Sequence, residues 1–162
     1  MPDLVTRDLD WIERAPISIR GTAHSAAAPD AVFAELADHE RWPEWFPRVK
    51  KVEVIGAASG VGARRRVTIP GSVVEETFIA WDEGSRWTFT ATMAKPGLFR
   101  SLVEDCRLTA TADGGTDISY TMYFEAAGVG KVLFRFGKGT VEKGLSQAMQ
   151  NLAARAARAS KP

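Results

Sequence analysis

The C-terminal segment constrains the fold more than any other part of the chain. From Val129 to Ala159 there is no proline, and apolar residues recur at spacings of three, four and five. This pattern predicts one long amphipathic helix of about 45 Å, which needs a surface to cover. Gly137, Gly139 and Gly144 each weaken such a helix by about 1 kcal/mol relative to alanine. We therefore expect a local reason for them: a close approach to that surface or to a ligand, or a bend.

Extended segments with alternating apolar residues supply the surface. Short turns rich in glycine, proline and aspartate connect them, which favours antiparallel neighbours. Two short helices are expected between the first and second strands, one beginning near Pro29 and one around Trp42. The predicted fold is therefore α+β, a seven-stranded curved antiparallel sheet wrapped around the long C-terminal helix. The predicted strands are 17–25, 48–56, 63–69, 73–81, 86–93, 99–112 and 116–126.

Length and composition fit one globular domain. The 162 residues are 45% hydrophobic and 25% charged, as in an ordinary soluble protein. We interpret 1–16 as an N-terminal arm and 17–159 as the single domain. The net charge of +1 gives no bulk attraction for nucleic acid. The arginine cluster 64–66 lies on a predicted strand, where side chains alternate, so its members cannot share one face. No nucleic-acid partner is expected.

Targeting signals are missing from the sequence as given. Its first residues do not combine a basic segment with an apolar one, and no stretch reaches the roughly 20 apolar residues of a membrane span. We expect a cytoplasmic protein without an integral membrane segment, as a monomer or weak homodimer. The lone Cys106 excludes an internal disulfide and is assigned to packing.

Strand alternation places ionisable groups on the face toward the helix. In the predicted strand 99–112, Glu104 lies on the same face as the apolar residues, which should point inward, and Arg65 does so in the strand 63–69. Glu75 and Glu76 are adjacent, so one of them must also point inward. Buried charges are costly unless they are paired. Two interpretations stay open: a structural ion pair or a bulge that returns one group to solvent, and a polar pair that orients a ligand carbonyl or hydroxyl.

One helix cannot fill the whole concavity of a seven-stranded sheet. The remainder is either packed core or a cavity. Trp42, Trp45 and Phe46 form either the rim of the cavity entrance or a packing cluster that closes one end of the domain. The loop 94–100 is a candidate mobile flap over the entrance. The expected ligand-binding residues are Trp45, Phe46, Val67, Trp87, Phe89, Leu102, Glu104, Tyr120, Met122, Leu133, Phe136 and Val141.

Several stretches carry a resemblance to a known family. These are WPEWFPRVKKVEVIG, GVGARRRVTIP, the hairpin VEETFIAWDEGSRWTFT, and DGGTDISYTMYFE. They resemble the polyketide cyclase/dehydrase group of the START/SRPBCC superfamily, which includes START-related lipid-transfer and birch-pollen-allergen-like (Bet v 1-like) proteins. The resemblance covers roughly 17–158. It implies the helix-grip fold with an apolar cavity, and functions that range from lipid, sterol or quinone binding to aromatic cyclisation.

Catalytic motifs are missing from the sequence. There is no HxH, HExxH, CxxC or GxSxG pattern, so neither a metal nor a cofactor is expected. Acid–base chemistry needs only a base and hydrogen-bond donors, for which Glu104 with Arg65 and Tyr120 are the candidates. The leading hypothesis is a binder of a hydrophobic small molecule such as a lipid, isoprenoid or polyketide. The alternatives are a polyketide cyclase or dehydratase, and a protein-interaction module with a collapsed pocket.

Overall fold

The computed structural model describes residues 4–160. Its helical elements are η1 (Leu9–Arg14), α1 (Pro29–Ala37), η2 (His39–Glu44) and α2 (Gly130–Ala159), of which η1 and η2 are 3-10 helices. Its strands are β1 (Ile17–Ser25), β2 (Lys51–Ile55), β3 (Arg64–Ile69), β4 (Ser72–Asp82), β5 (Arg86–Lys95), β6 (Phe99–Ala110) and β7 (Thr116–Ala126). In this part of the chain no helix is both long enough and apolar enough to cross a bilayer.

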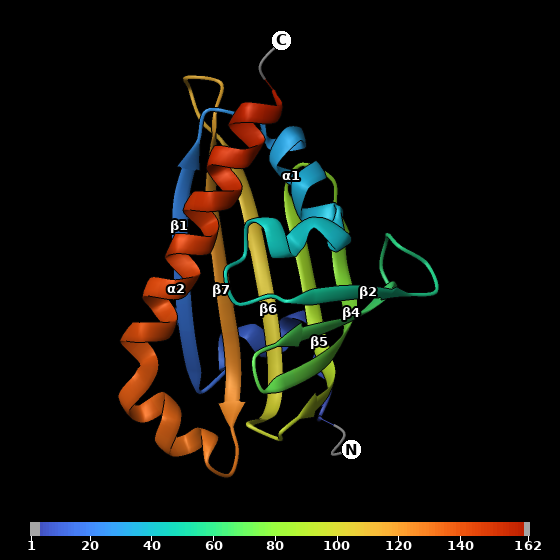
Figure 1. Ribbon diagram of the computed structural model, residues 1–162, viewed down its shortest axis with the longest axis vertical. Coiled ribbons are helices and arrows are strands. Elements are labelled where there is room, and N and C mark those ends of the chain that lie inside the picture. Colours follow the sequence, from blue (N-terminus) through green and yellow to red (C-terminus); the bar gives the residue numbers. More distant parts are fainter. Residues whose placement is uncertain (1–3, 161–162) are drawn as a thin grey trace.

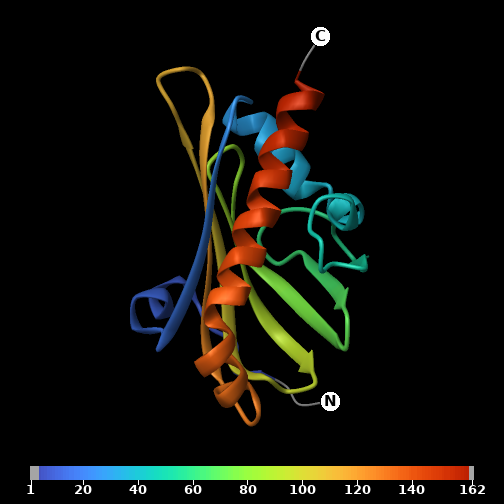
Figure 2. The same cartoon turned by 60° about the vertical axis from the view of Figure 1, so that its left-hand side comes forward.

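The seven strands form one antiparallel sheet, as predicted. The order is β1-β7-β6-β5-β4-β3-β2, so β2 to β7 form a meander and β1 joins its far edge by pairing with β7. The sheet curves, and α2 lies along its concave side together with α1 and η2 (Figures 1 and 2). The predicted helix-grip arrangement is confirmed, with strand ends that differ from the predicted ends by up to three residues.

The second half of α2 is pressed directly onto β1. A Cβ atom on Gly21 would lie 2.7 Å from the carbonyl carbon of Leu145 and from the nitrogen of Ser146, so only glycine allows this contact. Further along, the Ser25 hydroxyl donates to the Ala153 carbonyl at 2.8 Å. These contacts fix the position of α2 from Leu145 onward.

Two clusters of buried apolar side chains hold α2 to the sheet. The first turns of α2 carry Phe134, whose ring lies 4.6 Å from that of Phe124 on β7. This smaller cluster also contains Leu4, Ile19, Val74, Ala91, Ala94, Leu102 and Ala126. The larger cluster surrounds the second half of α2 and includes Trp42, Trp87, Phe89, Tyr120, Leu145, Met149 and Leu152. Met122 on β7 contacts both.

The three glycines inside α2 are not explained by a close approach to the sheet. A Cβ atom on Gly137, Gly139 or Gly144 would meet nothing within 4 Å. The close approach involves Gly21 on β1 instead. Gly139 is exposed, whereas Gly137 and Gly144 are half-buried on the stripe that carries Phe134, Val141 and Ala148 toward the sheet.

The segment before β1 completes the sheet on its convex side. The β5–β6 ladder stops at the pair Thr90–Val103. Beyond it, the Leu4 amide donates to the Thr92 carbonyl at 3.0 Å and the Val5 amide to the Arg100 carbonyl at 2.9 Å. The arm thus bridges two strands that have separated, and η1 continues it on the side of the sheet opposite α2 (Figure 2).

Candidate functional site

Strand alternation decides which glutamate of β4 faces inward, because Val74, Glu76 and Phe78 are buried on one face of the strand. The β4–β5 register shifts at this point, but the extra residue is Thr92 on β5, so the alternation of β4 is not interrupted. Glu76 is buried on the concave face, whereas Glu75 points outward and forms ion pairs with Arg66 at 2.6 Å and Arg64 at 3.6 Å. The three consecutive arginines therefore divide between the two faces as predicted, with Arg65 alone on the inside.

Arg65 is the centre of a buried polar group. Its side chain is 1% exposed, and its Nε donates to Oε2 of Glu76 at 2.6 Å. Its guanidinium carbon lies 4.0 Å from the ring centre of Trp42 and 4.7 Å from that of Trp87, with Phe89 and Phe78 slightly farther away. Stacking on aromatic faces and a charge-assisted hydrogen bond compensate for the lost hydration of this cation.

His39 completes the group around Arg65. The guanidinium donates to Nδ1 at 3.2 Å, and Nε2 lies 3.0 Å from the Ala58 carbonyl, which assigns the ring proton to Nε2. Burial, and then the positive charge of Arg65, lower the pKa of His39 to about 4. The imidazole is neutral at pH 7, so the aromatic residues around Arg65 enclose a single cation.

Glu104 on β6 forms a second polar pair with Tyr120 on β7. The Tyr120 hydroxyl donates to Oε2 of Glu104. Burial, and then the negative charge of Glu76, raise the pKa of Glu104 to about 8, although Tyr120 and Arg65 act in the opposite direction. Burial also raises the pKa of Glu76 and that of Tyr120 well above its usual value. Because Glu76 is bonded directly to Arg65, we assign the negative charge at pH 7 to Glu76 and the proton to Glu104.

Glu104 lies at the level of the sheet where the two apolar clusters meet. Along the sheet, Glu104 pairs with Met122, which lies between the two apolar clusters; we call this level the waist. The segment of α2 between Phe134 and Leu145 carries Gly137 and Gly144, and a Cβ atom on either would meet nothing within 4 Å.

Partial exposure of inward-pointing side chains shows that solvent reaches the waist. Glu104, Met122 and Val141 are all half-buried, although each points between helix and sheet. Their neighbours along the same faces, such as Tyr120 and Phe124, are fully buried. The space between sheet and helix is thus densely packed above and below the waist and accessible at the waist itself.

This geometry gives Glu104 a distinct chemical capacity. Among the described residues its Oε2 accepts from Tyr120, and no bond is made by Oε1. With a pKa of about 8 the carboxyl is mostly protonated at pH 7 and can donate its proton to a carbonyl oxygen. In its ionised fraction it can accept a proton, which suits general acid–base chemistry near neutral pH.

Two buried tryptophans have indole N–H groups without a partner in the described structure. They are the Nε1 atoms of Trp45 and Trp87. An unpaired buried donor costs about 1–3 kcal/mol. The nearby Trp42 differs, because its N–H donates to the Leu36 carbonyl at 2.9 Å. The orphan donor of Trp87 belongs to a side chain that contacts Arg65 and Tyr120, beside the candidate site.

Most of the residues expected to bind a ligand lie on the concave face. Val67, Trp87, Phe89, Leu102 and Tyr120 are buried there. Trp45 is also buried, at 4.6 Å from Trp42 between ring centres, and Phe46 stacks on the same pair. For Trp42 and Trp45 the structure therefore shows the packing cluster rather than an exposed rim. The loop 94–100 is tied to the turn between β7 and α2, because the Ala127 amide donates to the Leu98 carbonyl at 2.9 Å.

Leu133 and Phe136 do not lie where the sequence predicted. They are 53% and 81% exposed and point away from the sheet. The start of α2 has two apolar stripes, and the sequence does not tell which of them faces inward. Phe134 and Val141 belong to the inward stripe. The expectation that Leu133 and Phe136 line an enclosed cavity is therefore wrong.

The sequence analysis missed His39 as a member of the site and left Glu76 undecided. His39 lies in a short 3-10 helix outside any strand pattern, so alternation could not place it. The presence of a buried arginine was the available signal, because such a cation requires partners from other elements. For Glu76 the available signal was the parity of β4, because Val74 and Phe78 share its buried face.

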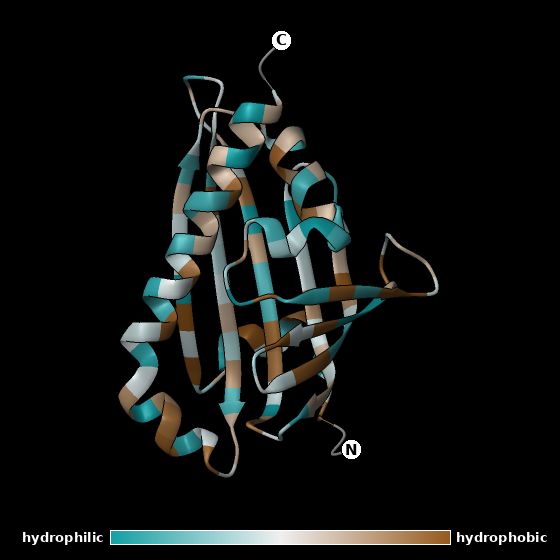
Figure 3. Cartoon of the chain, in the orientation of Figure 1, coloured by the Kyte–Doolittle hydropathy of each residue, from teal (hydrophilic) through white to brown (hydrophobic). Residues whose placement is uncertain are grey.

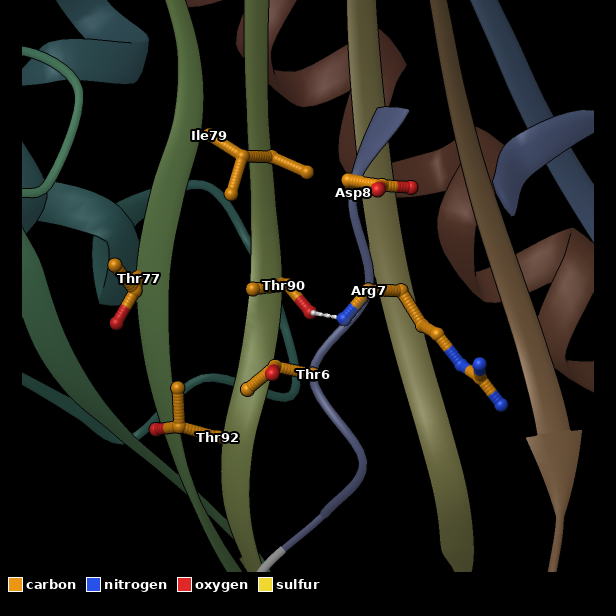
Figure 4. A pocket seen from close by; sticks show the side chains of 7 residues that line it. All are labelled: Thr6, Arg7, Asp8, Thr77, Ile79, Thr90 and Thr92. Atoms are coloured by element: carbon orange, nitrogen blue, oxygen red, sulfur yellow. Dashed lines mark hydrogen bonds between the residues drawn. The ribbon is translucent and has the colours of Figure 1, made fainter. Parts of the chain in front are cut away.

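Two shallow grooves lie outside the site. One, of about 460 Å³, is on the convex face between the arm and β4, where the Arg7 amide donates to Oγ1 of Thr90 (Figure 4). The other, of about 560 Å³, lies along the outer side of α2 around Glu142 and Gln147. Neither opens between α2 and the sheet. Within residues 4–160 no cluster of histidine, cysteine or acidic side chains is arranged to hold a metal ion.

Solved structures confirm the architecture. The Zhui aromatase/cyclase of a Streptomyces species superposes with a TM-score of 0.75 at 17% identity, covering 90% of this chain and 96% of that one. A START superfamily protein of Mycobacterium smegmatis superposes with a TM-score of 0.67 at 13% identity, covering 85% and 97%. Identities this low establish a shared fold only.

Sequence comparison is more specific. An uncharacterized protein of Mycobacterium tuberculosis is 32% identical over 122 residues, which cover 74% of this chain and 72% of that protein. The family model described as polyketide cyclase / dehydrase and lipid transport matches residues 16–157. This match spans all seven strands and nearly all of α2. The chain therefore belongs to the polyketide cyclase/dehydrase and lipid transport family.

Proposed function

We propose that the protein binds an apolar small molecule that carries a carbonyl or hydroxyl group, at the waist between α2 and the sheet. The observation that carries the proposal is the partial exposure of Glu104, Met122 and Val141 at the waist, together with the open space around Gly137 and Gly144. Apolar side chains from both clusters would surround the body of the ligand. The free oxygen of Glu104 would make its polar contact, as a few convergent polar groups do in apolar pockets.

The family and its fold relatives are consistent with this proposal. The family description includes lipid transport, and one relative in structure is an aromatase/cyclase. A lipid, isoprenoid or polyketide would match the apolar surroundings. A hydrogen bond from a protonated Glu104 to a buried ligand oxygen would add about 1 kcal/mol of affinity over a ligand that lacks the oxygen.

Ligand titration with a matched pair of glycine variants tests the proposal. The probes are fluorescent lipids and aromatic polyketides, read by their own emission and by tryptophan quenching. Gly144→Leu should abolish binding by occupying the open space, whereas Gly139→Leu, the same change on the exposed side of α2, should leave the affinity unchanged. Failure of all probes to bind the unmodified protein would refute the proposal and favour a protein-interaction module.

A second candidate is a cyclase or dehydratase that uses Glu104 as general acid and base. The observation that favours it is the Glu104 pKa of about 8, beside a Tyr120 hydroxyl that remains protonated. Intramolecular aldol condensation of a poly-ketone requires removal of a proton next to one carbonyl and proton donation to another. Arg65 would act only through its charge, because its side chain is enclosed by Trp42 and Trp87.

Exchange chemistry separates the second candidate from simple binding. A bound β-diketone should exchange its α-hydrogens with deuterated water faster than the free compound, as followed by NMR. Glu104→Gln should remove this acceleration while the diketone still binds. Equal exchange rates with the two proteins would exclude Glu104 as the base.

A further inference from the structure

The start of α2 exposes an apolar stripe that the fold does not cover. Val129, Val132, Leu133 and Phe136 follow the spacing i, i+3, i+4 and i+7, so they share one side of the helix; we call them the α2 patch. They are 73%, 63%, 53% and 81% exposed. Four large apolar side chains gathered in two turns are unusual on a free surface and indicate an interaction site. Brown segments mark the region on the lower part of α2 in Figure 3.

Cations flank the α2 patch. Lys131, Arg135 and Lys138 follow the spacing i, i+4 and i+7 and are all exposed. No acidic residue occurs between Glu125 and Glu142. None of the three cations takes part in an ion pair among the described residues, and Glu125 lies 3.8 Å from both Arg7 and Arg100. The potential around the patch is therefore positive.

We infer that the α2 patch docks the protein onto an anionic lipid surface. A helix with an apolar stripe next to a basic stripe lies in the membrane interface, with the apolar side chains among the acyl chains and the cations at the headgroups. Lys95 and Arg100 lie on either side of the loop that contacts the start of α2 through Leu98, and they add positive charge at the same end of the molecule.

The charges disfavour a second copy of the chain as the occupant. In a two-fold symmetric dimer the same surface meets itself, so the cations around one patch would approach those around the other. The patch is also small, since stable protein interfaces involve about 20 residues on each side. A lipid surface supplies the opposite charge and an apolar phase together.

Docking would bring the waist close to the lipid phase. Gly137, the first of the inward-turned glycines of α2, directly follows Phe136 in the sequence. The inference extends the proposed function, because an apolar ligand would then be exchanged with the bilayer. The surface itself can be tested without any ligand, so the two proposals succeed or fail separately.

Vesicle flotation with the full chain tests the inference. The probes are vesicles of phosphatidylcholine with about one-third phosphatidylserine, and vesicles of phosphatidylcholine alone. The protein should float with the anionic vesicles and dissociate as salt is raised. Phe136→Ser should reduce partitioning about tenfold or more, and Lys131→Gln, Arg135→Gln and Lys138→Gln together about 100-fold. Val61→Ser, which alters another side chain that is 70% exposed, should have no effect.

Three results would overturn the inference. The first is no flotation of the unmodified protein with anionic vesicles. The second is flotation that persists in Phe136→Ser, with circular dichroism showing that the variant is folded. The third is a stable dimer in sedimentation equilibrium that Phe136→Ser converts to monomer, which would assign the patch to a second copy of the chain.

Discussion

Replacing Glu104 with glutamine tests whether folding holds this carboxyl in its protonated form. The pKa is about 8 in the folded protein, against 4.5 for an ordinary glutamate. A carboxyl whose pKa is raised by folding contributes its full stability below the ordinary value, and this contribution is lost as the pH rises through the folded value. From pH 5 to pH 8 the linkage relation gives a loss of about 3 kcal/mol from this one residue.

Urea unfolding at several pH values between 5 and 8 measures the effect. Glutamine retains an oxygen that can accept from Tyr120 but does not titrate. The free energy of unfolding of the variant minus that of the unmodified protein should therefore increase by about 3 kcal/mol over this range. Taking the difference removes the titrating groups that do not interact with Glu104, such as His39. The titration of Glu76 stays in the difference, because the two carboxyls interact. Glu53→Gln is the control, because Lys51 lowers the pKa of the exposed Glu53 and its difference should not increase above pH 5.

A difference that stays constant from pH 5 to pH 8 would refute the reasoning. It would mean that Glu104 is already ionised at pH 5 in the folded protein. In that case the carboxyl could not donate a proton to a ligand carbonyl at neutral pH. The cyclase candidate would lose its acid, and binding would remain the only function the waist supports.

Three further predictions concern packing. Gly144→Ala should raise the melting temperature by about 3 °C, because nothing lies within 4 Å of the new methyl group. Gly21→Ala should lower the melting temperature, because its Cβ would lie 2.7 Å from the backbone of α2. Thermal melts that rank the two variants in reverse would contradict the described contacts. Trp87→Phe should lower the free energy of unfolding, measured in urea, by about 1 kcal/mol less than Trp42→Phe does, because only Trp42 loses a hydrogen bond. Equal losses in the two variants would show that the Trp87 indole has a partner. Burial raises the pKa of the Cys106 thiol, so a disulfide reagent should modify it only as the protein unfolds, and rapid modification under native conditions would refute its burial.

The sheet was predictable because its information is local. A period of two and turns such as Asp113–Gly115 identify each strand without reference to the others, and Ile17–Ser25 and Thr116–Ala126 end where the sequence predicts. The inward direction of Arg65 and Glu104 followed from the same parity. The parity of β4 also selects Glu76, because Val74 and Phe78 share its buried face. His39 did not follow from any strand pattern, because it joins the site from a 3-10 helix whose position depends on tertiary packing.

The helix shows a different limit. Helical spacing identified α2 but could not choose between two apolar stripes one residue apart, so Phe136 was placed inside and is exposed. The glycines of α2 are unusual in a helix, and a close contact to the sheet is one reason that the sequence suggests for them. That contact is made by Gly21, and an isolated glycine inside a strand is the pattern that marks such a close approach of another backbone.

The bridge formed by the arm has a consequence for how the chain reaches its final state. Arg7 bonds to Thr90 and Ser101, which lie 83 and 94 residues downstream. The arm has no site to bind until β5 and β6 have formed and separated. Its docking is therefore a late step in folding that depends on long-range contacts. We expect partially folded molecules to have a detached arm and a slit in the sheet where Leu4 belongs, vulnerable to proteases and to pairing with the arm of a neighbouring molecule.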